Sequence, residues 1–346
     1  MNSNQTMRAA VITRFGPPEV LQFRDLAIPT IGLGDVLVRT KAIGLNFAEV
    51  FARLGYYPGI PKPPFVPGIE FAGIVEKTGA SVRGLKKGDR VFGFTKQNAY
   101  AEYVAVPKDF VLRMPRKMTF EQAAAFAVAP MTAYHGLVTL AHVQRGERLL
   151  VHAAAGGVGT AALQIAKHLG ATTYATVGSQ AKMKVAMDLG AKMVINYSTD
   201  DFASVIRNDT KDEGLDVIFD SVGGKTMRKG WKLLAPMGRY VLFGFAAVAG
   251  ERKVNKVKAL GEILSVPLIY PPSLVTRNVS LMGFNLYFVV QKAAYLRKAM
   301  DQLLRWYEKG ILRPVVGTVF PFEKIVEAQE FLQSRKSIGK VVVTVP

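Results

Sequence analysis

A glycine-rich turn near the middle of the chain has the spacing of a nucleotide-binding motif. Residues 149–159 read LLVHAAAGGVG, an apolar strand followed by Gly156, Gly157 and Gly159 and then by a helix-forming stretch. Such a turn lets the backbone approach a diphosphate, and the first N–H groups of the helix attract its charge. Ala154 stands where the motif has its first glycine. Because strand, turn and helix follow in this order, we predict dinucleotide binding, with a purely structural turn as the alternative.

The end of the next predicted strand indicates which dinucleotide binds. Ser179 lies twenty residues after Gly159, where NAD enzymes place an acid on the ribose hydroxyl. The chain has no acid there; it has Ser179 and Lys182, whose hydroxyl and ammonium groups suit a 2′-phosphate. We therefore predict NADPH as the cofactor. The alternative is a helix cap beside a surface lysine.

The composition excludes several other chemistries. The 346 residues include no cysteine, so disulfides, thiolate metal sites and a cysteine nucleophile are impossible. No run of residues approaches the ~18 apolar positions of a spanning helix. The first seven residues lack the basic and apolar regions of a signal peptide. We expect a soluble, cytoplasmic protein.

The net charge of +19, from 45 basic and 26 acidic residues, attracts anions but does not indicate which kind of anion binds.

The densest basic stretch, 252–258, is predicted to be a solvated loop, with a docking patch as the alternative. The apolar, proline-broken stretch 263–275 that follows is interpreted as a loop at a subunit interface or over the cleft. The alternative is peripheral contact with an anionic membrane. No interleaving of aromatic and basic residues supports a specific nucleic-acid partner.

The elements that must position these residues change in kind along the chain. The first hundred residues are predicted to be β-rich, because short apolar runs alternate with Gly and Pro. From residue 148 strands alternate with helices, which indicates βαβ units and a parallel sheet. The predicted strands are 9–12, 36–39, 71–75, 90–94, 101–106, 149–152, 172–176, 193–196, 217–220, 240–243, 280–284 and 339–345, and the predicted helices are 157–169, 181–189, 293–309 and 323–332.

Two further segments carry local signals. Thr119 and Gln122 have the spacing of a capping box, so we predict a helix over 123–129 that Pro130 ends or kinks. The Gly- and Pro-rich segment 54–68 is predicted to be irregular, and the loop 53–65 is predicted to form the lip of the substrate pocket. The overall prediction is an α/β fold of two domains, with cofactor and substrate meeting in the crevice between them.

The sequence also resembles a known family over essentially its whole length from Met7. The resemblance is to the zinc-independent quinone oxidoreductases (zeta-crystallin type) of the medium-chain dehydrogenase/reductase superfamily. Asn285-Leu286, after residues 282–284, is most similar to the branch of the vesicle amine transport protein homologues. The segments that carry the family resemblance are 44–49, 153–159, 176–182, 194–197 and 220–223.

This resemblance implies the domain plan and the quaternary structure. Residues 1–128 would be the first part of a GroES-like catalytic domain, residues 129–287 a doubly wound Rossmann NADPH-binding domain, and residues 288–346 a return to the catalytic domain. The protein would be a homodimer.

The resemblance also implies roles for individual residues. Gly156, Gly157, Val158 and Gly159 would hold the diphosphate, Ser179 and Lys182 the 2′-phosphate, and Tyr197 would lie beside the adenosine. Ser221, Val222, Gly223, Phe243, Gly244 and Phe245 would line the nicotinamide half, and Lys340 would complete the cleft. Asn46 and Thr132 match positions close to the nicotinamide ribose or ring. Tyr197 and Phe245 as core aromatics, and Asn46 as a turn residue, are the alternatives.

The sequence departs from its zinc-dependent relatives and from the usual quinone reductase motif. Ile69 stands where zinc-dependent enzymes have a histidine ligand, so we predict no metal site and a structural role for the neighbouring Glu70. The motif's acid is Glu49, three residues after Asn46. A frequent tyrosine is replaced by Phe51, which leaves Tyr57 as the weaker candidate for proton donation.

The chemistry that fits these residues is direct hydride transfer from NADPH without a metal ion. The acceptor would be a quinone or an α,β-unsaturated carbonyl, which is electrophilic enough without Lewis-acid help. Two alternatives stay open: an enoyl-thioester reductase, and a low-turnover NADPH-binding protein that acts at membranes or on partner proteins.

Overall fold

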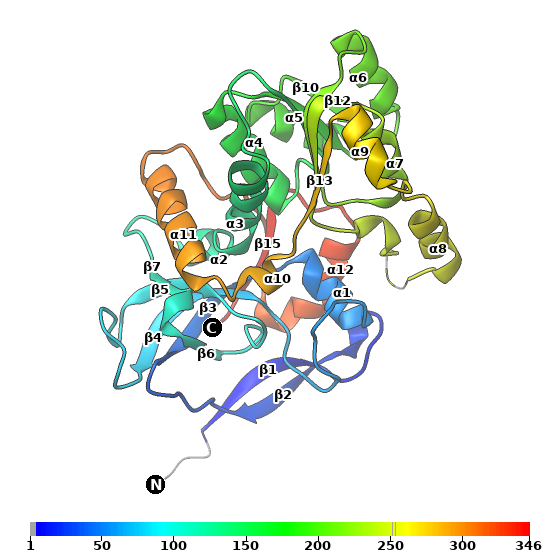
Figure 1. Ribbon diagram of the computed structural model, residues 1–346. Coiled ribbons are helices and arrows are strands. Elements are labelled where there is room, and N and C mark those ends of the chain that lie inside the picture. Colours follow the sequence, from blue (N-terminus) through cyan, green and yellow to red (C-terminus); the bar gives the residue numbers. More distant parts are fainter. Residues whose placement is uncertain (1–4, 251, 253) are drawn as a thin grey trace.

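Two β-sheets of different construction organise the chain, and Figure 1 shows one above the other. The structure is a computed structural model that describes residues 5–250, 252 and 254–346. The upper sheet is parallel and flanked by helices. The lower sheet is mainly antiparallel, and the chain returns to it at the end (β15, red in Figure 1).

The parallel sheet has six strands in the order β10-β9-β8-β11-β12-β13. Because the order runs outward from β8 in both directions, a crevice opens between β8 and β11, where doubly wound sheets bind their ligands. Its strands are β8 (Arg148–Val151), β9 (Thr172–Val177), β10 (Met193–Asn196), β11 (Leu215–Asp220), β12 (Leu234–Leu242) and β13 (Ser280–Gly283). Its helices are α4 (Gly157–Leu169), α5 (Gln180–Asp188), α6 (Phe202–Thr210), α7 (Gly224–Trp231), α8 (Lys256–Leu264) and α9 (Pro271–Arg277).

The second sheet has seven strands, and its last two strands come from the end of the chain. Its order is β14-β15-β3-β4-β5-β7, with β6 also paired to β3. A separate hairpin, β1 (Thr6–Ile12) and β2 (Leu21–Ala27), lies at the base of the molecule in Figure 1. The strands of the sheet are β3 (Asp35–Gly44), β4 (Glu70–Thr78), β5 (Arg90–Phe94), β6 (Tyr103–Pro107), β7 (Val111–Arg113), β14 (Val316–Pro321) and β15 (Lys340–Thr344). The helices are α1 (Phe47–Leu54), α2 (Phe120–Ala124), α3 (Val128–Tyr134), α10 (Leu286–Val289), α11 (Ala293–Glu308) and α12 (Ile325–Gln333).

This architecture confirms the predicted fold class, a β-rich GroES-like unit combined with a parallel-sheet Rossmann-like unit. From residue 148 to 196 every predicted strand and helix lies within one residue of the observed element. The agreement is close there because each element packs against its sequence neighbour, so the local apolar pattern decides the structure.

The predicted helix over 123–129 is wrong. The capping box at Thr119 is present, with Gln122 N donating to Thr119 Oγ1 at 3.2 Å, but α2 already ends at Ala124. A new helix, α3, begins at Val128, whose N–H donates to Glu70 Oε2 at 2.9 Å. Pro130 therefore lies in the first turn of α3, where a proline needs no N–H.

The loop prediction for residues 252–258 and 263–275 is also wrong in part. Helix α8 begins at Lys256, where Asn255 caps it by accepting a hydrogen bond from Lys258 N at 3.1 Å. The apolar stretch that follows contains the end of α8 and all but two residues of α9. Glu251 and Lys253 lie outside the described residues.

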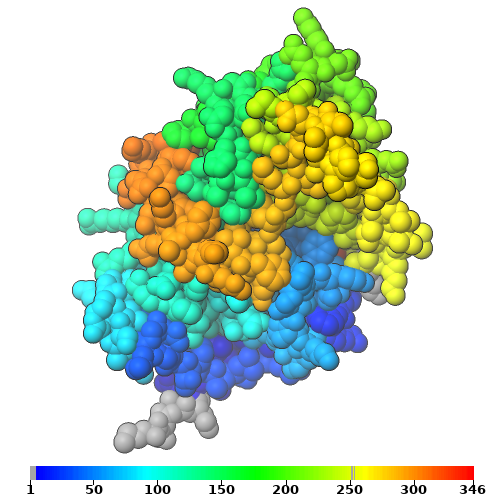
Figure 2. All heavy atoms as spheres, in the orientation of Figure 1, coloured from blue at the N-terminus to red at the C-terminus, as the bar shows by residue number. Residues whose placement is uncertain are grey.

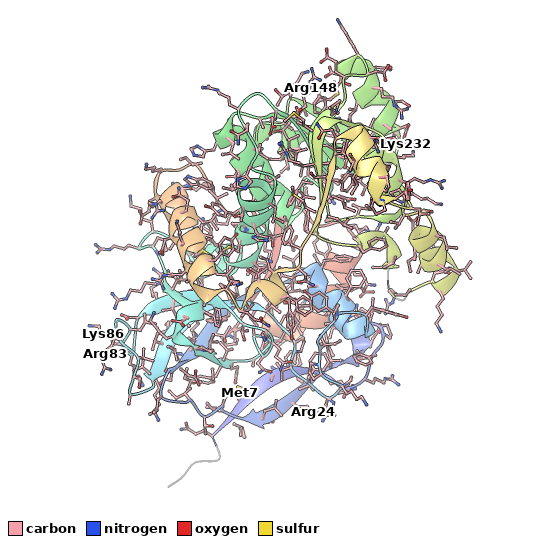
Figure 3. All side chains as sticks on the ribbon, in the orientation of Figure 1. Met7, Arg24, Arg83, Lys86, Arg148 and Lys232 are labelled. Atoms are coloured by element: carbon pink, nitrogen blue, oxygen red, sulfur yellow. The ribbon has the colours of Figure 1, made fainter. Side chains whose placement is uncertain are left out.

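Charged side chains cover both units. Figure 3 places Arg24, Arg83 and Lys86 on the lower unit and Arg148 and Lys232 on the upper one, in keeping with a scattered positive charge. In the described part of the chain, no helix is both long and apolar enough to cross a bilayer.

Candidate active site

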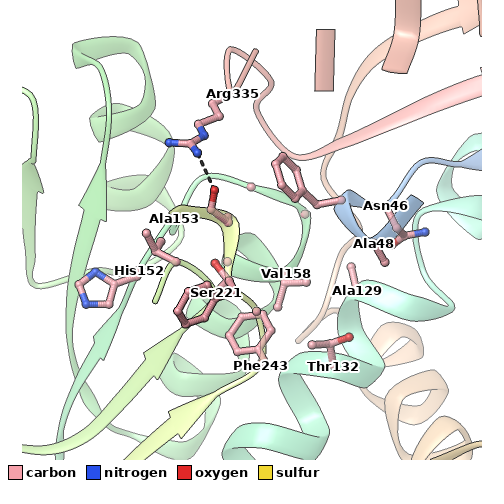
Figure 4. A pocket seen from close by; sticks show the side chains of 18 of the residues that line it. Asn46, Ala48, Ala129, Thr132, His152, Ala153, Val158, Ser221, Phe243 and Arg335 are labelled. Carbon is pink, nitrogen blue, oxygen red and sulfur yellow. Dashed lines mark hydrogen bonds between the residues drawn. The ribbon is translucent and has the colours of Figure 1, made fainter. Parts of the chain in front are cut away.

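A cavity of about 800 Å³ lies where the two units meet. Figure 4 shows its two walls: Asn46 and Thr132 on the catalytic side, and Val158, Ser221 and Phe243 on the side of the parallel sheet. The predicted site residues that line this cavity are Asn46, Tyr57, Thr132, Gly156, Gly157, Val158, Gly159, Lys182, Tyr197, Ser221, Val222, Phe243, Gly244, Phe245 and Lys340. The other three, Glu49, Ser179 and Gly223, lie behind or beside the lining.

The glycine turn forms a cradle at the start of α4. A Cβ atom on Gly159 would lie 2.5 Å from Ala153 O, so no side chain fits there. The first N–H groups of a helix have no partner inside it, and the residues that carry them, 157–159, line the cavity. Gly339 N donates to Ala155 O at 2.7 Å, which ties the turn to the segment before β15. These observations fit the diphosphate of a dinucleotide.

The cationic end of the cavity is built from both units. Lys182 Nζ, on α5, donates to Arg335 O at 2.5 Å, although the two residues are 153 positions apart. Arg335 also lines the cavity, and its guanidinium donates to Ala246 O at 2.6 Å (Figure 4). Burial lowers the pKa of Lys182 from its ordinary value. Sequence reasoning missed Arg335, because residues around it carry no motif and its position follows from the return of the chain.

Ser179 and Tyr197 flank the same end differently. Ser179 is the N-cap of α5 and lies beside the lining rather than in it. Tyr197 lines the cavity and is half exposed. Its hydroxyl approaches Gly178, where a Cβ atom would collide with it. The glycine thus lets the aromatic ring lie against the end of β9, consistent with a face for the adenosine.

A buried carboxylate holds the turn after β11, which was predicted to line the nicotinamide half. Asp220, at the end of β11, accepts hydrogen bonds from Val222 N at 2.6 Å, Gly223 N at 3.2 Å and Tyr240 Oη at 2.7 Å. Gly223 has a left-handed backbone (φ +69) and supports the turn from behind. Phe243 stacks on a buried phenylalanine with ring centroids 4.1 Å apart. The wall against the ring is therefore rigid and mostly apolar.

Asn46, Lys340 and Glu70 form a closed polar cluster at the catalytic wall. Lys340 Nζ donates to Asn46 Oδ1 at 2.6 Å and forms an ion pair with Glu70. Asn46 Nδ2 donates to Glu70 Oε1 at 2.9 Å. Lys340 is 4% exposed and Glu70 is fully buried, which confirms the structural role predicted for Glu70. Because each group holds the other two, the Asn46 amide has one orientation.

Glu49 lies behind Asn46 and outside the cavity lining. Its carboxylate accepts hydrogen bonds from Asn46 N at 3.0 Å, Ile69 N at 3.0 Å and Tyr100 Oη at 2.5 Å. Burial raises the pKa of Glu49 to about 7, against the lowering effect of these hydrogen bonds. The structure thus places the predicted Glu49 against the backbone of Asn46 and outside the lining of the cavity.

The part of the cavity beside Asn46 is apolar and aromatic. Phe47 and Phe51, with ring centroids 5.7 Å apart, line it together with Phe94 and Phe284. Thr132 is buried in the same wall, and its hydroxyl donates to the backbone of α3, to Val128 O at 2.8 Å. Such a lining suits a flat, unsaturated acceptor.

Tyr57 joins the irregular loop to the segment between β13 and α10. Its hydroxyl donates to Asn285 Oδ1 at 2.8 Å, and burial raises its pKa. Tyr287 makes a second contact across the cleft, because its hydroxyl donates to Gly59 O at 2.9 Å. Sequence reasoning did not assign Asn285 or Tyr287 to the site, since their contacts exist only after the loop folds over α10.

His152 is a further lining residue that sequence reasoning quoted within the glycine motif but did not assign. Its Nδ1 is 2.8 Å from Thr176 Oγ1. Its buried Nε2 has no hydrogen-bond partner among the described residues. Burial lowers the pKa of His152. The ring also packs edge-on against Phe202, with centroids 5.0 Å apart, so His152 supports the cavity wall from within.

Metal ligands do not gather at this cleft. In the described ranges, no three His, Cys, Asp or Glu side chains are placed to hold an ion together. Lys340 brings an ammonium group to Glu70 and Asn46.

A GroES-like unit joined to a dinucleotide-binding parallel sheet defines the class, the medium-chain dehydrogenases/reductases. Comparison with known proteins agrees: the alcohol dehydrogenase GroES-like domain family matches residues 32–116, and the zinc-binding dehydrogenase family matches residues 189–343. The chain belongs to the zinc-independent, quinone oxidoreductase-like family of that superfamily.

Three relatives illustrate this membership. The synaptic vesicle membrane protein VAT-1 homolog of Rattus norvegicus is 35% identical over 97% of this chain and 84% of its own. The Escherichia coli quinone oxidoreductase, solved in complex with NADPH, has a TM-score of 0.85 and 30% identity over 97% of this chain and 99% of its own. The CurK enoyl reductase has a TM-score of 0.86 and 29% identity over 99% and 100%.

Proposed function

We propose that this protein is an NADPH-dependent oxidoreductase that reduces a quinone or an α,β-unsaturated carbonyl. One observation carries the proposal: a single cavity joins a glycine cradle and two cationic side chains, Lys182 and Arg335, to an aromatic pocket. The NADPH complex of the Escherichia coli relative supports this cofactor. When bound, NADPH supplies a hydride, and the protein contributes position and electrostatics.

The catalytic wall can orient the reactants without supplying a strong acid. Asn46, held by Lys340 and Glu70, presents a fixed amide to the cavity. We propose that Asn46 and Thr132 contact the nicotinamide end and that Lys340 lowers the energy of negative charge that develops nearby. Tyr57 also lines the cavity with a protic side chain, but its proton is already donated to Asn285. Solvent therefore delivers the proton that completes the reduction.

The apolar pocket favours acceptors that need no ion to polarise them. Phe47, Phe51 and Phe94 exclude water from the reacting atoms, which strengthens electrostatic interactions in the site. A quinone or enone carries its own electron-poor carbon or oxygen. These properties support hydride transfer to a conjugated acceptor rather than to a simple ketone.

A stopped-flow screen of NADPH oxidation tests the proposal. Quinones, enals, enoyl-thioesters and a saturated ketone would be compared at equal concentration. We expect turnover with quinones or enals, and none with the ketone. Tight NADPH binding without oxidation by any acceptor would contradict the proposal and would favour the low-turnover binding protein.

An enoyl-thioester reductase is the second candidate. Lys225 and Lys258 also line the cavity and would suit an acidic carrier or a phosphorylated thioester, whereas Lys229 is paired with Asp201. The similarity to the CurK enoyl reductase supports the same alternative. A higher kcat/KM for enoyl-thioesters than for free quinones in the same screen would make this the preferred function.

For its assembly we propose a homodimer. Strand β13 is an edge of the parallel sheet, and exposed edges pair readily with a second strand. Beside it lies what we call the α8–α9 surface, which Figure 2 shows as a projecting yellow margin. Its exposed apolar residues are Val257, Leu260, Ile263, Leu264, Leu268, Tyr270 and Val275.

Light scattering and liposome co-sedimentation distinguish the occupants of this surface. We expect a dimer in solution and no sedimentation with neutral vesicles. A monomer that sediments with anionic vesicles, and is released by high salt, would instead assign the surface to a membrane. Cytoplasmic location, and the lack of a specific nucleic-acid partner, stay predictions that fractionation and salt-dependent RNA binding would check.

A further inference from the structure

A chain of buried polar side chains runs from the catalytic wall into the lower unit. Arg53 Nε, at the end of α1, donates to Gln329 Oε1 at 2.7 Å. Gln329 Nε2 donates to Tyr100 Oη at 3.1 Å, and Tyr100 Oη donates to Glu49 Oε2 at 2.5 Å. The same carboxylate oxygen accepts from Asn46 N. We call this series the Glu49 branch.

A second series starts from the same guanidinium. Another amino group of Arg53 donates to Gln333 Oε1, and Gln333 Nε2 donates to Gly250 O at 2.7 Å. Gly250 closes the segment 246–250, whose first two residues, Ala246 and Ala247, line the cavity. We call this series the Gly250 branch. Both glutamines lie on α12, one helical turn apart, so one helix supplies both links.

The two branches are too well buried to be a surface network. Arg53, Gln329 and Tyr100 are each 0% exposed, and Gln333 and Glu49 are almost as inaccessible. Burial lowers the pKa of Arg53 to about 10, so the guanidinium stays charged at neutral pH. Two neutral side chains, Gln329 and Tyr100, link Arg53 to Glu49, and each of them donates its hydrogen bond toward Glu49. Hydrogen bonds that point the same way along a chain strengthen one another.

The two branches end on different walls of the cavity. The Glu49 branch ends on the backbone of Asn46, the residue whose amide faces the cavity. The Gly250 branch ends on the segment that Arg335 also holds, through Ala246 O and Ala249 O. One branch therefore supports the catalytic wall, and the other supports the nucleotide wall.

We propose that Arg53 is a positioning residue for hydride transfer, which orients Asn46 through Gln329, Tyr100 and Glu49 and holds segment 246–250 through Gln333. Arg53 is buried and does not line the cavity. The kinetic part of this inference rests on the proposed function, whereas the structural part does not.

A matched pair of isosteric variants separates the two branches. Gln329→Glu keeps the acceptor for Arg53 but loses the donor to Tyr100, and Gln333→Glu does the same toward Gly250. With one ordinary hydrogen bond lost in each, we expect Gln329→Glu to lower kcat about tenfold with the Kd for NADPH nearly unchanged. We expect Gln333→Glu to raise the Kd for NADPH about fivefold with kcat nearly unchanged.

Hydrogen exchange on the cofactor-free protein gives a readout that needs no turnover. Amide exchange should accelerate over residues 44–49 in Gln329→Glu and over 246–250 in Gln333→Glu. Tyr100→Phe breaks the Glu49 branch without adding a charge and replaces Gln329→Glu if that variant does not fold. Turnover by the wild-type protein tests the proposed function. If the wild type shows no turnover, hydrogen exchange in the variants still tests whether the two branches support separate segments.

The opposite results would overturn the proposal. If both variants only lower the melting temperature, with kcat, Kd and exchange as in the wild type, Arg53 is a structural residue. If either variant changes kcat and Kd together and accelerates exchange over both segments, the branches are not separate. Kd and hydrogen exchange can be measured in any of these variants that folds.

Discussion

The two ends of the cavity are built in contrasting ways. The nucleotide end uses a local motif, the turn 153–159. Its cations, Lys182 and Arg335, are half-buried or exposed and would bind the negative charge of the nucleotide. The acceptor end uses Asn46, Glu70 and Lys340, which come from separate elements and form a polar cluster whose ion pair is buried, and Tyr57, which bonds to Asn285. A charge change at the first end should alter affinity, whereas one at the second should alter stability and rate.

The largest effect is expected from Lys340→Met. Removing the ammonium leaves the buried carboxylate of Glu70 unpaired, so the free energy of unfolding should fall by about 3–5 kcal/mol, with most turnover lost. Urea denaturation measures the loss. The double variant Lys340→Met with Glu70→Gln is the control and should recover much of the stability. A decrease in the free energy of unfolding below about 1 kcal/mol would mean that the Lys340–Glu70 ion pair is exposed to water.

Lys182→Glu tests the nucleotide end. Placing a carboxylate where the 2′-phosphate is read should weaken NADPH about 100-fold and NADH only slightly, because NADH lacks that phosphate. Fluorescence titration of both nucleotides gives the two Kd values. Lys184→Glu, on the same helix and already paired with Asp188, is the matched control. If the variant bound NADPH and NADH with equally reduced affinity, Lys182 would not be the residue that binds the 2′-phosphate.

The pKa of Glu49 predicts a pH dependence of both rate and stability. Below about pH 7 Glu49 takes up a proton and can no longer accept all its hydrogen bonds, so kcat should fall up to about tenfold. The folded pKa lies above the unfolded value, so the folded state binds more protons between about 4.5 and 7. This group therefore lowers the free energy of unfolding as pH rises through that window.

Glu49→Gln provides the control for both dependences. Its kcat and its urea midpoint should lose the component that titrates near pH 7. A variant that keeps the wild-type profile would assign the titration to another group.

The smallest effect is expected at Tyr57, although it lies in the acceptor pocket. Because its proton is donated to Asn285, Tyr57→Phe should reduce kcat only about two- to fivefold. The neighbouring exposed Tyr56, changed to Phe, is the matched control. A loss above about 100-fold would make Tyr57 the proton donor and would reverse the contrast between the two ends.

Prediction from sequence succeeded where neighbours in the chain are neighbours in space. The turn at 156–159 needs only the strand before it and the helix after it, and both were located within one residue. The helix at 123–129 failed because Glu70, from β4, accepts from Val128 N and sets the start of α3. Local pattern cannot supply a distant carboxylate.

The same distinction holds for single residues of the site. Lys182, which lines the cavity, was predicted because it follows Ser179, which stands a known distance after the glycine turn. Arg335 and Asn285 were missed because Arg335 is placed by the return of the chain and Asn285 by the loop that folds over it. Arg53 showed no sign of its role in the sequence, since its partners are 276 and 280 residues away.

The sequence by itself determined the phosphate-binding turn, the alternation of strands and helices, and the lack of thiol ligands. These depend on residue type and short spacing. Tertiary structure alone decided which polar groups meet at the acceptor end, because a buried ion pair or hydrogen-bonded chain forms only when elements far apart in sequence exclude water together.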